Sequence, residues 1–316
     1  MGGLADATLL AAVAIGSLRG AGALLRAGWP RRAPATAILL WQALGLAGGL
    51  AAVGALLAIG VGGPGVAQSG VLGGLAGLLR RDAAGKLFGQ GEPPLITLVR
   101  IGTLLAGVAL FAALCWVLVM AFVAAVQARK RQRELLALLA HGDPKAPGAL
   151  VIDYPAAAAY CLPGIKSQIV VSAGTLELLA PAELAAVLAH ERAHLRARHD
   201  LVLIPFTSLR RAFPHSRVIC QGYRTVALLV EMMADDRALR VRGLFARELA
   251  MALLRFGTAG AEVAPAGAMA AAEGELTARV NRLLTPPRPL PSAAQAAIVL
   301  AAAALVATPV LLLITP

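Results

Sequence analysis

The sequence predicts a multi-pass α-helical membrane protein with four spans and an α+β domain between the third and fourth spans. Two observations carry this prediction. Hydrophobic residues make up 59% of the 316-residue chain, and the mean hydropathy is +0.75, whereas an ordinary soluble protein is about half apolar. A charged stretch, residues 129–290, separates the apolar N-terminal region from an apolar C-terminal segment, and it is long enough to form one folded domain.

The spans follow from the gaps between charged residues. No Asp, Glu, Lys or Arg occurs at 33–79, 101–128 or 289–316, and each gap exceeds the roughly 20 residues that cross a bilayer core. The predicted spans are 35–61, 101–126 and 293–314, within a membrane region 1–128 and a C-terminal segment 291–316. A further span, 4–24, contains Arg19, which lies close enough to its end to reach the headgroups. A cleaved signal peptide is the alternative for 4–24, but basic residues do not precede this apolar stretch.

The basic residues predict the orientation in the membrane. They cluster at 19–32, after the first span, and at 129–133, after the third. By the positive-inside rule both clusters are cytoplasmic, so residues 129–290 face the cytoplasm and both termini are external. This anchoring, together with anionic lipid, accounts for the net charge of +12. No aromatic-interleaved basic patch accompanies the charge, so direct nucleic-acid binding is not expected.

The charged domain combines helices and strands. We expect a helix at 129–141, a turn at 142–144, and strands at 150–154 and 167–172, where β-branched residues lie between turn formers. Pro181 opens a helix that runs through His194, and another helix covers about 226–241. The three cysteines (Cys115, Cys161 and Cys220) form no C-x-x-C motif, so we expect unreactive packing residues in a reducing cytosol.

The most informative motif is H-E-x-x-H, formed by His190, Glu191 and His194. On a helix, positions i and i+4 share a face, so both imidazoles can bind one metal ion. Glu191 is rotated off this face and is predicted to be the general base that acts on a water molecule at the metal. Zinc suits the arrangement, because a catalytic zinc site has three protein ligands and one position for water.

The predicted third ligand is Glu231. It shares a helical face with Asp235, and two histidines with a carboxylate from a separate helix form a common catalytic zinc set. Asp235 is placed to accept the other N–H of a ligand histidine. Asp200 is the alternative ligand, since extended motifs place a ligand six residues after the second histidine. Those motifs need a glycine where this chain has Ala197, so Glu231 is favoured.

Several segments together resemble the BlaR/MecR family of membrane zinc metallopeptidases, which is of the gluzincin type and related to the HtpX-type membrane proteases. They are Leu162-Pro-Gly-Ile-Lys166, Ile169-Val-Val-Ser172, Glu183 to His194, His199-Asp200 and Glu231-Met-Met-Ala-Asp-Asp236. The resemblance implies a zincin-like domain, the ligands His190, His194 and Glu231, and the base Glu191. It also implies a bacterial inner-membrane location and regulated proteolysis of a cytosolic repressor. The β-lactam receptors of this family carry an external penicillin-binding domain, and no such domain is found in this sequence.

The resemblance further implies that the strand Ile169, Val170, Val171 and Ser172 is an edge to which an extended substrate adds. Candidate donors to the oxyanion are His199, His215, Tyr223 and Arg237, and the sequence does not choose among them. An HtpX-like quality-control protease is one alternative function. A membrane receptor or scaffold with structural zinc is another, although Glu191 would have no use there. Whether the chain forms a homo-oligomer is left open.

Overall fold

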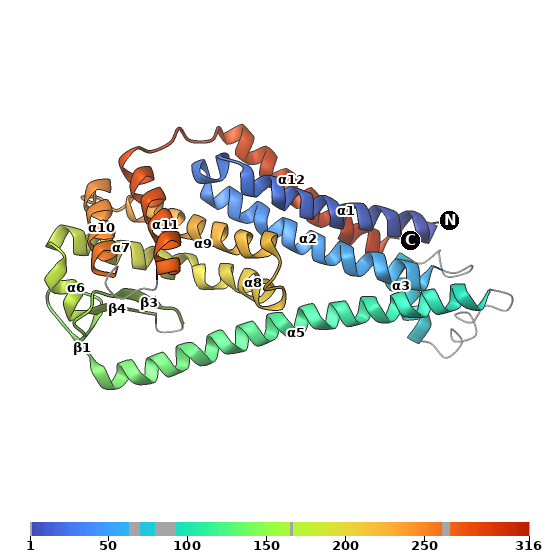
Figure 1. Cartoon of the computed structure of the whole chain (residues 1–316), viewed down its shortest axis with the longest axis horizontal. Helices are drawn as coiled ribbons and strands as arrows, with labels where there is room; N and C mark the ends of the chain where they lie inside the picture. The colour runs from blue at the N-terminus through green and yellow to red at the C-terminus, as the bar shows by residue number, and fades with distance from the viewer. Residues whose placement is uncertain (1, 63–69, 80–92, 165–166, 261–265, 316) are drawn as a thin grey trace. The chain divides into compact units, whose positions relative to one another are not determined.

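A computed structural model describes residues 2–62, 70–79, 93–164, 167–260 and 266–315. The chain is mostly helical and divides into two compact units (Figure 1). One unit consists of Met1–Leu118 with Leu290–Pro316, and the other is Val119–Pro289. The long helix α5 contributes residues to both units.

The first unit is built from helices: α1 (Gly2–Arg26), the 3-10 helix η1 (Trp29–Arg32), α2 (Pro34–Val61), α3 (Gly70–Leu79), the first part of α5 (Pro94–Leu139), and α12 (Ser292–Ile314). Four segments of the described chain are long and apolar enough to cross a membrane: Leu4–Arg26, Pro34–Val61, Pro94–Leu139 and Ser292–Ile314. They contain the four predicted spans. By the same positive-inside orientation the loop 62–99, between the second and third predicted spans, is expected to be external, and much of it lies outside the described residues.

Small residues let the helices of this unit approach closely. At Gly60 an added Cβ would lie 2.7 Å from the Cβ of Leu104, so α2 and α5 meet here without an intervening side chain. At Gly54 it would lie 3.0 Å from Leu313 of α12. Such contacts are typical of membrane helices, which associate by packing because lipid gives no hydrophobic drive for their association.

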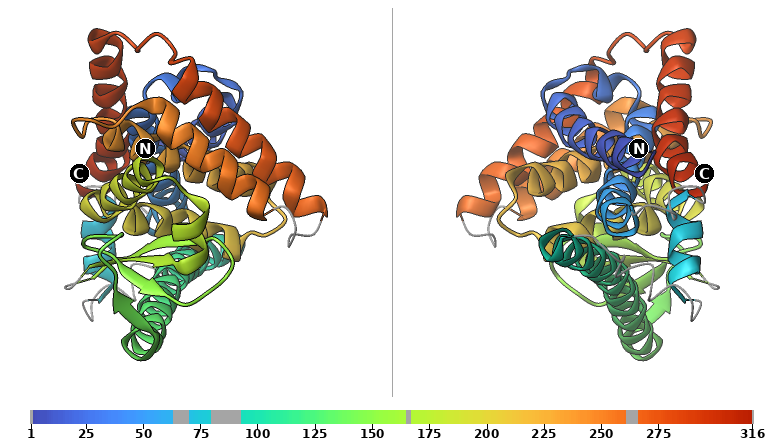
Figure 2. Two further views of the ribbon diagram at one scale, coloured as in Figure 1. Left: turned by 90° about the vertical axis from the view of Figure 1, so that its left-hand side faces the viewer. Right: turned by 90° about the vertical axis from the view of Figure 1, so that its right-hand side faces the viewer.

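The second unit contains a four-stranded sheet of β1 (Ala140–Gly142), β2 (Leu150–Ile152), β3 (Ala159–Leu162) and β4 (Gln168–Ser172). The strand order is β1-β2-β4-β3; β2 and β4 are parallel, and the outer pairs are antiparallel. The strands lie side by side in yellow-green in Figure 2. The helix expected at 129–141 ends at Leu139, and β1 occupies part of the predicted turn.

The prediction that Ile169–Ser172 is an edge strand is wrong. Val170 of β4 pairs with Leu150 on one side and with Tyr160 on the other, so β4 is an inner strand and β3 is the edge. Ile169, Val170 and Val171 are all buried, and a continuous apolar run of this kind is typical of a strand covered on both faces. The two residues Ile165 and Lys166, which precede β4 in the family-like motif, lie outside the described residues.

Besides the end of α5, the described part of the unit contains the helices α6 (Ala173–Leu178), α7 (Pro181–Ala197), α8 (His199–Ala212), α9 (Arg217–Ala238), α10 (Ala246–Gly260) and α11 (Ala266–Leu284). Helix α9 begins nine residues before the predicted start, and neither α10 nor α11 was expected from the sequence. These two helices contact each other and appear as an orange pair in Figure 2.

Helix α7 is fixed at both ends and along one face. Pro181 opens it, and Glu183 Oε2 accepts a hydrogen bond from the backbone N–H of Ala180 at 2.9 Å. Leu184, Val187 and Leu188 pack in one core cluster with residues of β2 and β4. The helix ends at Ala197, and the C-cap residue Arg198 has a φ of +51° that turns the chain directly into α8.

Candidate metal centre

The H-E-x-x-H helix α7 packs against α9, and three potential ligand atoms converge between them. His190 Nε2 lies 3.0 Å from His194 Nε2 and 3.3 Å from Glu231 Oε2. His194 Nε2 lies 3.5 Å from Glu231 Oε1. Among the described residues, His190, His194 and Glu231 form the cluster that could hold a metal ion.

The donor set fits a divalent metal ion. Zinc bonds of about 2.0–2.1 Å in a tetrahedron place neighbouring ligand atoms about 3.3–3.4 Å apart. The three separations, 3.0, 3.3 and 3.5 Å, lie on either side of that value. The histidine side chains are largely buried, whereas 37% of the Glu231 side chain is exposed. The cluster is therefore anchored inside the domain and accessible to water from the Glu231 side.

Each histidine is supported through its other ring nitrogen. His190 Nδ1 lies 2.9 Å from Asp235 Oδ1, and the Asp235 side chain is 1% exposed. His194 Nδ1 lies 3.0 Å from His199 Nδ1, and His199 is buried. Partners of this kind orient the ring and select the tautomer in which Nε2 faces the metal.

The surrounding charges shift the pKa of these groups in opposite directions. Burial lowers the pKa of His190, but hydrogen bonds to Asp235 and Glu231 outweigh burial and raise it to about 9. Burial, with the neighbouring charges of His194 and Arg237, lowers the pKa of His199 to about 3. In the metal-free cluster the carboxylates therefore favour a protonated His190, whose Nε2 proton a metal ion would displace, and burial keeps His199 neutral behind His194.

Arg279 of α11 is a residue of the centre that the sequence analysis missed. Its Nη1 lies 3.0 Å from Glu231 Oε2, and its Nη2 and Nε donate to the two oxygens of Asp235 at 2.7 and 2.9 Å. Burial alone would raise the pKa of Glu231 and of Asp235, but the histidine hydrogen bonds and the Arg279 charge hold both below their ordinary values. Both carboxylates are therefore ionised.

A second arginine–aspartate pair, next to the Arg279–Asp235 pair, also ties α11 to α9. Arg282 Nη1 and Nη2 donate to the two carboxylate oxygens of Asp236 at 2.6 and 2.8 Å. The two arginines are three residues apart, and the two aspartates are adjacent. No local pattern links these two segments, which lie more than 40 residues apart in the chain.

Glu191 lies beside the metal cluster and is not part of it. It is half-buried, and its carboxylate lies near the thiol of Cys161 on β3. Burial, followed by the nearby negative charge of Glu191, raises the pKa of Cys161 to about 12. Cys161 is therefore a protonated thiol at neutral pH, in keeping with its predicted lack of reactivity.

The candidate oxyanion donors and the alternative ligand Asp200 do not gather in one group. His199 is buried behind His194, and Arg237 Nη1 lies a loose 3.5 Å from His199 Nε2. His215 is exposed in the turn between α8 and α9, and the Tyr223 ring is covered by the guanidinium of Arg210 at 4.2 Å from its centroid. The alternative ligand Asp200 is paired with Arg129 at 2.8 Å and does not belong to the cluster.

Comparison with known proteins bears on the segment that carries this centre. Residues 125–256 match the family model of Peptidase family M48, whose members are metal-dependent peptidases. The matched segment includes α7, α8 and α9 with all three residues of the cluster, and it ends before Arg279. No curated protein and no solved structure matches the chain. Over the segment that holds these three potential metal ligands, the chain is thus similar to Peptidase family M48. This similarity supports a metallopeptidase.

Proposed function

We propose that the chain is a membrane-embedded zinc metalloendopeptidase that cleaves a cytosolic protein. The observation that carries the proposal is the convergence of His190, His194 and Glu231, with separations suited to tetrahedral zinc. The M48 match over 125–256 supports the peptidase chemistry. The HtpX-like and receptor alternatives remain outcomes of the experiment below.

In this proposal His190, His194 and Glu231 hold the zinc ion, and Glu191 is the general base. Zinc supplies Lewis acidity, which acidifies water and polarises a carbonyl group. Glu191 accepts a proton from the attacking water and then donates it to the leaving amine nitrogen of the peptide bond. Asp235 keeps a proton on His190 Nδ1, so that Nε2 is free to bind the metal.

The substrate backbone is proposed to add to the outer edge of β3. The backbone N–H of Ser172 donates to the carbonyl of Ala158 at 2.8 Å, so Ala158 belongs to a hydrogen-bonded pair with β4. Alternation along an antiparallel ladder then directs the N–H and C=O groups of Ala159 and Cys161 away from β4. An extended peptide can pair with these groups. Because the charge of Glu191 is close enough to raise the pKa of the Cys161 thiol, such a peptide would run near the base.

The basic clusters at 19–32 and 129–133 support a cytoplasmic peptidase domain, with both termini on the outer side of a bacterial inner membrane. A substrate on the cytoplasmic side is therefore expected. The motifs shared with the BlaR/MecR family favour regulated cleavage of one dedicated protein, such as a transcriptional repressor, over general removal of damaged membrane proteins.

The deciding experiment is substrate trapping with Glu191→Gln. The amide keeps the shape of the side chain but cannot accept the proton, so metal content should persist while cleavage falls by at least about 10²-fold. Proteins that co-purify with the inactive variant are then identified by mass spectrometry. One dominant cytosolic partner supports regulated proteolysis, and a broad set of membrane proteins supports quality control.

The matched control is Glu177→Gln, which makes the same change at an exposed glutamate of α6. It should leave both cleavage and metal content unchanged. If Glu191→Gln cleaves the trapped protein as fast as the wild type does, the hydrolase proposal fails and a receptor with a structural metal takes its place.

A further inference from the structure

The edge strand β3 is held at its start by two buried hydroxyl groups. Ser172 ends β4 and caps α6, and Thr175 lies in the first turn of α6; both residues are fully buried. Both hydroxyl oxygens accept from the backbone N–H of Ala158, at 2.9 and 2.8 Å. The carbonyl of Ala158 accepts from the Thr175 hydroxyl at 3.0 Å and from the Ser172 N–H at 2.8 Å. Both backbone groups of Ala158, the residue directly before β3, are therefore fixed.

This arrangement depends on hydroxyl chemistry. A hydroxyl oxygen can accept and donate hydrogen bonds at the same time. Thr175 Oγ1 uses both capacities on the N–H and the C=O of one residue, and it lies 3.0 Å from Ser172 Oγ. A valine side chain has the same shape as threonine but can form none of these bonds. Its introduction would leave buried backbone groups with fewer partners, and such groups are costly to leave unsatisfied.

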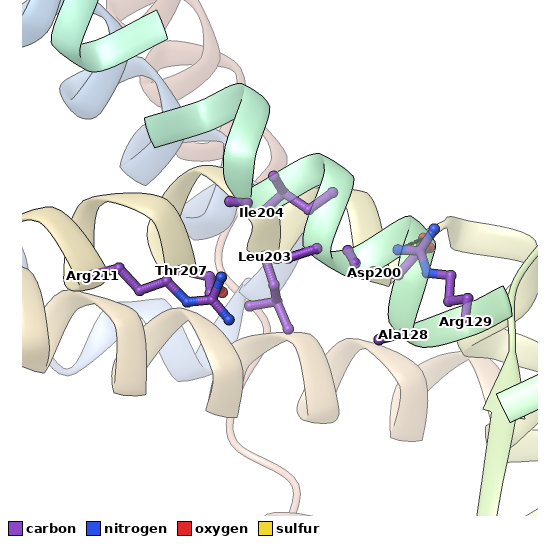
Figure 3. A pocket seen from close by; sticks show the side chains of 10 residues that line it. Ala128, Arg129, Asp200, Leu203, Ile204, Thr207 and Arg211 are labelled. Carbon is purple, nitrogen blue, oxygen red and sulfur yellow. Dashed lines mark ion pairs between the residues drawn. The ribbon is translucent and has the colours of Figure 1, made fainter. Parts of the chain in front are cut away.

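The other end of β3 is held from α5. Arg133 Nη2 donates to the carbonyl of Pro163, which directly follows β3, at 2.6 Å. One turn earlier on α5, Arg129 pairs with Asp200 of α8 at 2.8 Å (Figure 3). Because this ion pair fixes α5 against α8 next to Arg133, the guanidinium that holds the end of β3 is itself anchored within the unit.

The position of β3 explains why such contacts matter. It is the edge of the sheet, and its four residues pair with β4. A short strand at an edge opens more easily than an inner strand. A substrate that adds to a disordered edge must order it, and this ordering costs conformational entropy that is subtracted from the binding free energy. The contacts at Ala158 and Pro163 leave the outward N–H and C=O groups of Ala159 and Cys161 unused, so β3 is held without its outer edge being occupied.

We propose that Ser172, Thr175 and Arg133 are positioning residues that hold β3 as a preformed template for an extended substrate. This inference rests on the proposed function, because it takes β3 to be the strand to which the substrate backbone adds. The three side chains act through the backbone of β3 and do not touch the substrate. They should therefore affect substrate binding and leave the chemical step unchanged. Ser172, which the sequence placed on the substrate-binding edge, acts instead from the neighbouring strand.

Hydrogen–deuterium exchange of the full-length protein in detergent tests the support of β3 without any substrate. Ser172→Ala and Thr175→Val should speed exchange of the β3 amides roughly tenfold, because bonds that hold the strand are lost. Thr175→Ser keeps the hydroxyl and should exchange as the wild type does. The matched control is Ser208→Ala, which removes another buried hydroxyl, one that donates to the Pro205 carbonyl within α8 at 2.7 Å. It should leave β3 unchanged, and unaltered exchange of α7 in each variant shows that the domain is folded.

Steady-state cleavage of fluorescein-labelled β-casein then separates positioning from chemistry. Casein is an unfolded protein, and strand addition uses backbone groups that every sequence carries. Ser172→Ala and Thr175→Val should raise KM about tenfold and keep kcat per zinc-loaded molecule within about twofold. Arg133→Gln should raise KM about threefold, because a single hydrogen bond is lost. Its control, Arg131→Gln, removes the same charge from an exposed position of α5 and should keep the wild-type KM.

Three results would overturn the proposal. The first is unchanged exchange of the β3 amides in both Ser172→Ala and Thr175→Val. The second is faster exchange with an unchanged KM, because the hydroxyl groups would then have a structural role only. The third is an equal rise of KM in Arg131→Gln and Arg133→Gln, which would reduce the effect to charge. A wild type that cleaves no casein would count against the peptidase function, and the exchange of β3 would still decide whether these side chains hold the strand.

Discussion

Glu231 and Asp235 lie one turn apart on α9, yet their carboxylates have different surroundings. Glu231 faces the Nε2 atoms of both histidines and is 37% exposed, whereas Asp235 faces His190 Nδ1 and is 1% exposed. Its exposure leaves the Glu231 carboxylate open to water. Burial restricts Asp235 to orienting its partner, because an ionised buried carboxylate needs all its hydrogen bonds satisfied.

Replacement of the proposed third ligand should empty the site. We expect about one zinc ion per chain in the purified wild type and loss of most of it in Glu231→Ala, because one of three protein ligands is removed. Asp200→Ala should keep its zinc, since Asp200 pairs with Arg129 away from the cluster. Metal analysis of the two variants checks this. The opposite pattern, an empty Asp200→Ala and a filled Glu231→Ala, would identify Asp200 as the ligand.

The stability of the metal-free protein should fall as the pH drops below about 6.5. His194 Nδ1 and His199 Nδ1 lie 3.0 Å apart, so one ring must accept from the other, and two protonated rings could not share this contact. Burial and the neighbouring charges lower the pKa of His199 from 6.5 to about 3. The unfolded chain therefore takes up a proton at His199 first as the pH falls, and the folded state loses stability from pH 6.5 towards pH 3.

The pKa of His190 is raised to about 9, so its effect on the pH dependence of stability is opposite to that of His199 and falls in a different pH range. The stabilisation that protonated His190 contributes is complete below pH 6.5 and is lost as the pH rises towards 9. It therefore adds little to the slope of stability against pH on the acid side. Thermal unfolding of the metal-free protein in detergent measures the acid-side slope. His199→Gln, which accepts a hydrogen bond without titrating, should flatten it. An unchanged slope in this variant would show that other groups cause the acid sensitivity.

At the level of helices, α11 is tied to α9, which carries the proposed ligand Glu231, by two neighbouring arginine–aspartate pairs. Arg279 contacts both Asp235 and Glu231, whereas Arg282 pairs with Asp236. Arg279 can therefore affect metal binding through the proposed ligand Glu231. Substitution of Arg282 would show how much the docking of α11 contributes by itself.

Arg279→Gln should lower zinc affinity by about 10-fold to 100-fold, because the ligand and its supporting carboxylate lose their shared partner. Arg279→Lys should not restore it, since an ammonium group cannot bind Asp235 with two parallel hydrogen bonds. Arg282→Gln is the control and should leave zinc affinity nearly unchanged. Chelator competition measures the affinities. Equal losses in Arg279→Gln and Arg282→Gln would show that α11 acts only by docking.

For the molecule as a whole, the two basic clusters predict the compartment of each part. A reporter fused after Gly142 should be active in the cytoplasm, and a reporter fused after Pro316 should be active outside, because the helix Ser292–Ile314 is expected to cross the membrane between them. A phosphatase and a fluorescent protein at each position measure this. The same compartment at both positions would remove the fourth span.

Local sequence was sufficient for the features that depend on composition or on helical spacing. The charge-free gaps predicted three spans and the apolar N-terminal stretch a fourth, and all four lie within long apolar helices. The four-residue spacings of His190 with His194 and of Glu231 with Asp235 predicted same-face pairs, because a helix repeats every 3.6 residues whatever it packs against. Pro181 marked the start of α7 for the same local reason.

Only the tertiary structure decided which elements are neighbours. The short strand β3 has no strong local signal, yet it takes the sheet edge and leaves β4 in the interior. Arg279 and His199 reached their positions beside Asp235 and His194 through the packing of separate helices. Pairing between distant segments depends on how apolar faces pack together, and neither composition nor periodicity within one segment specifies its partner.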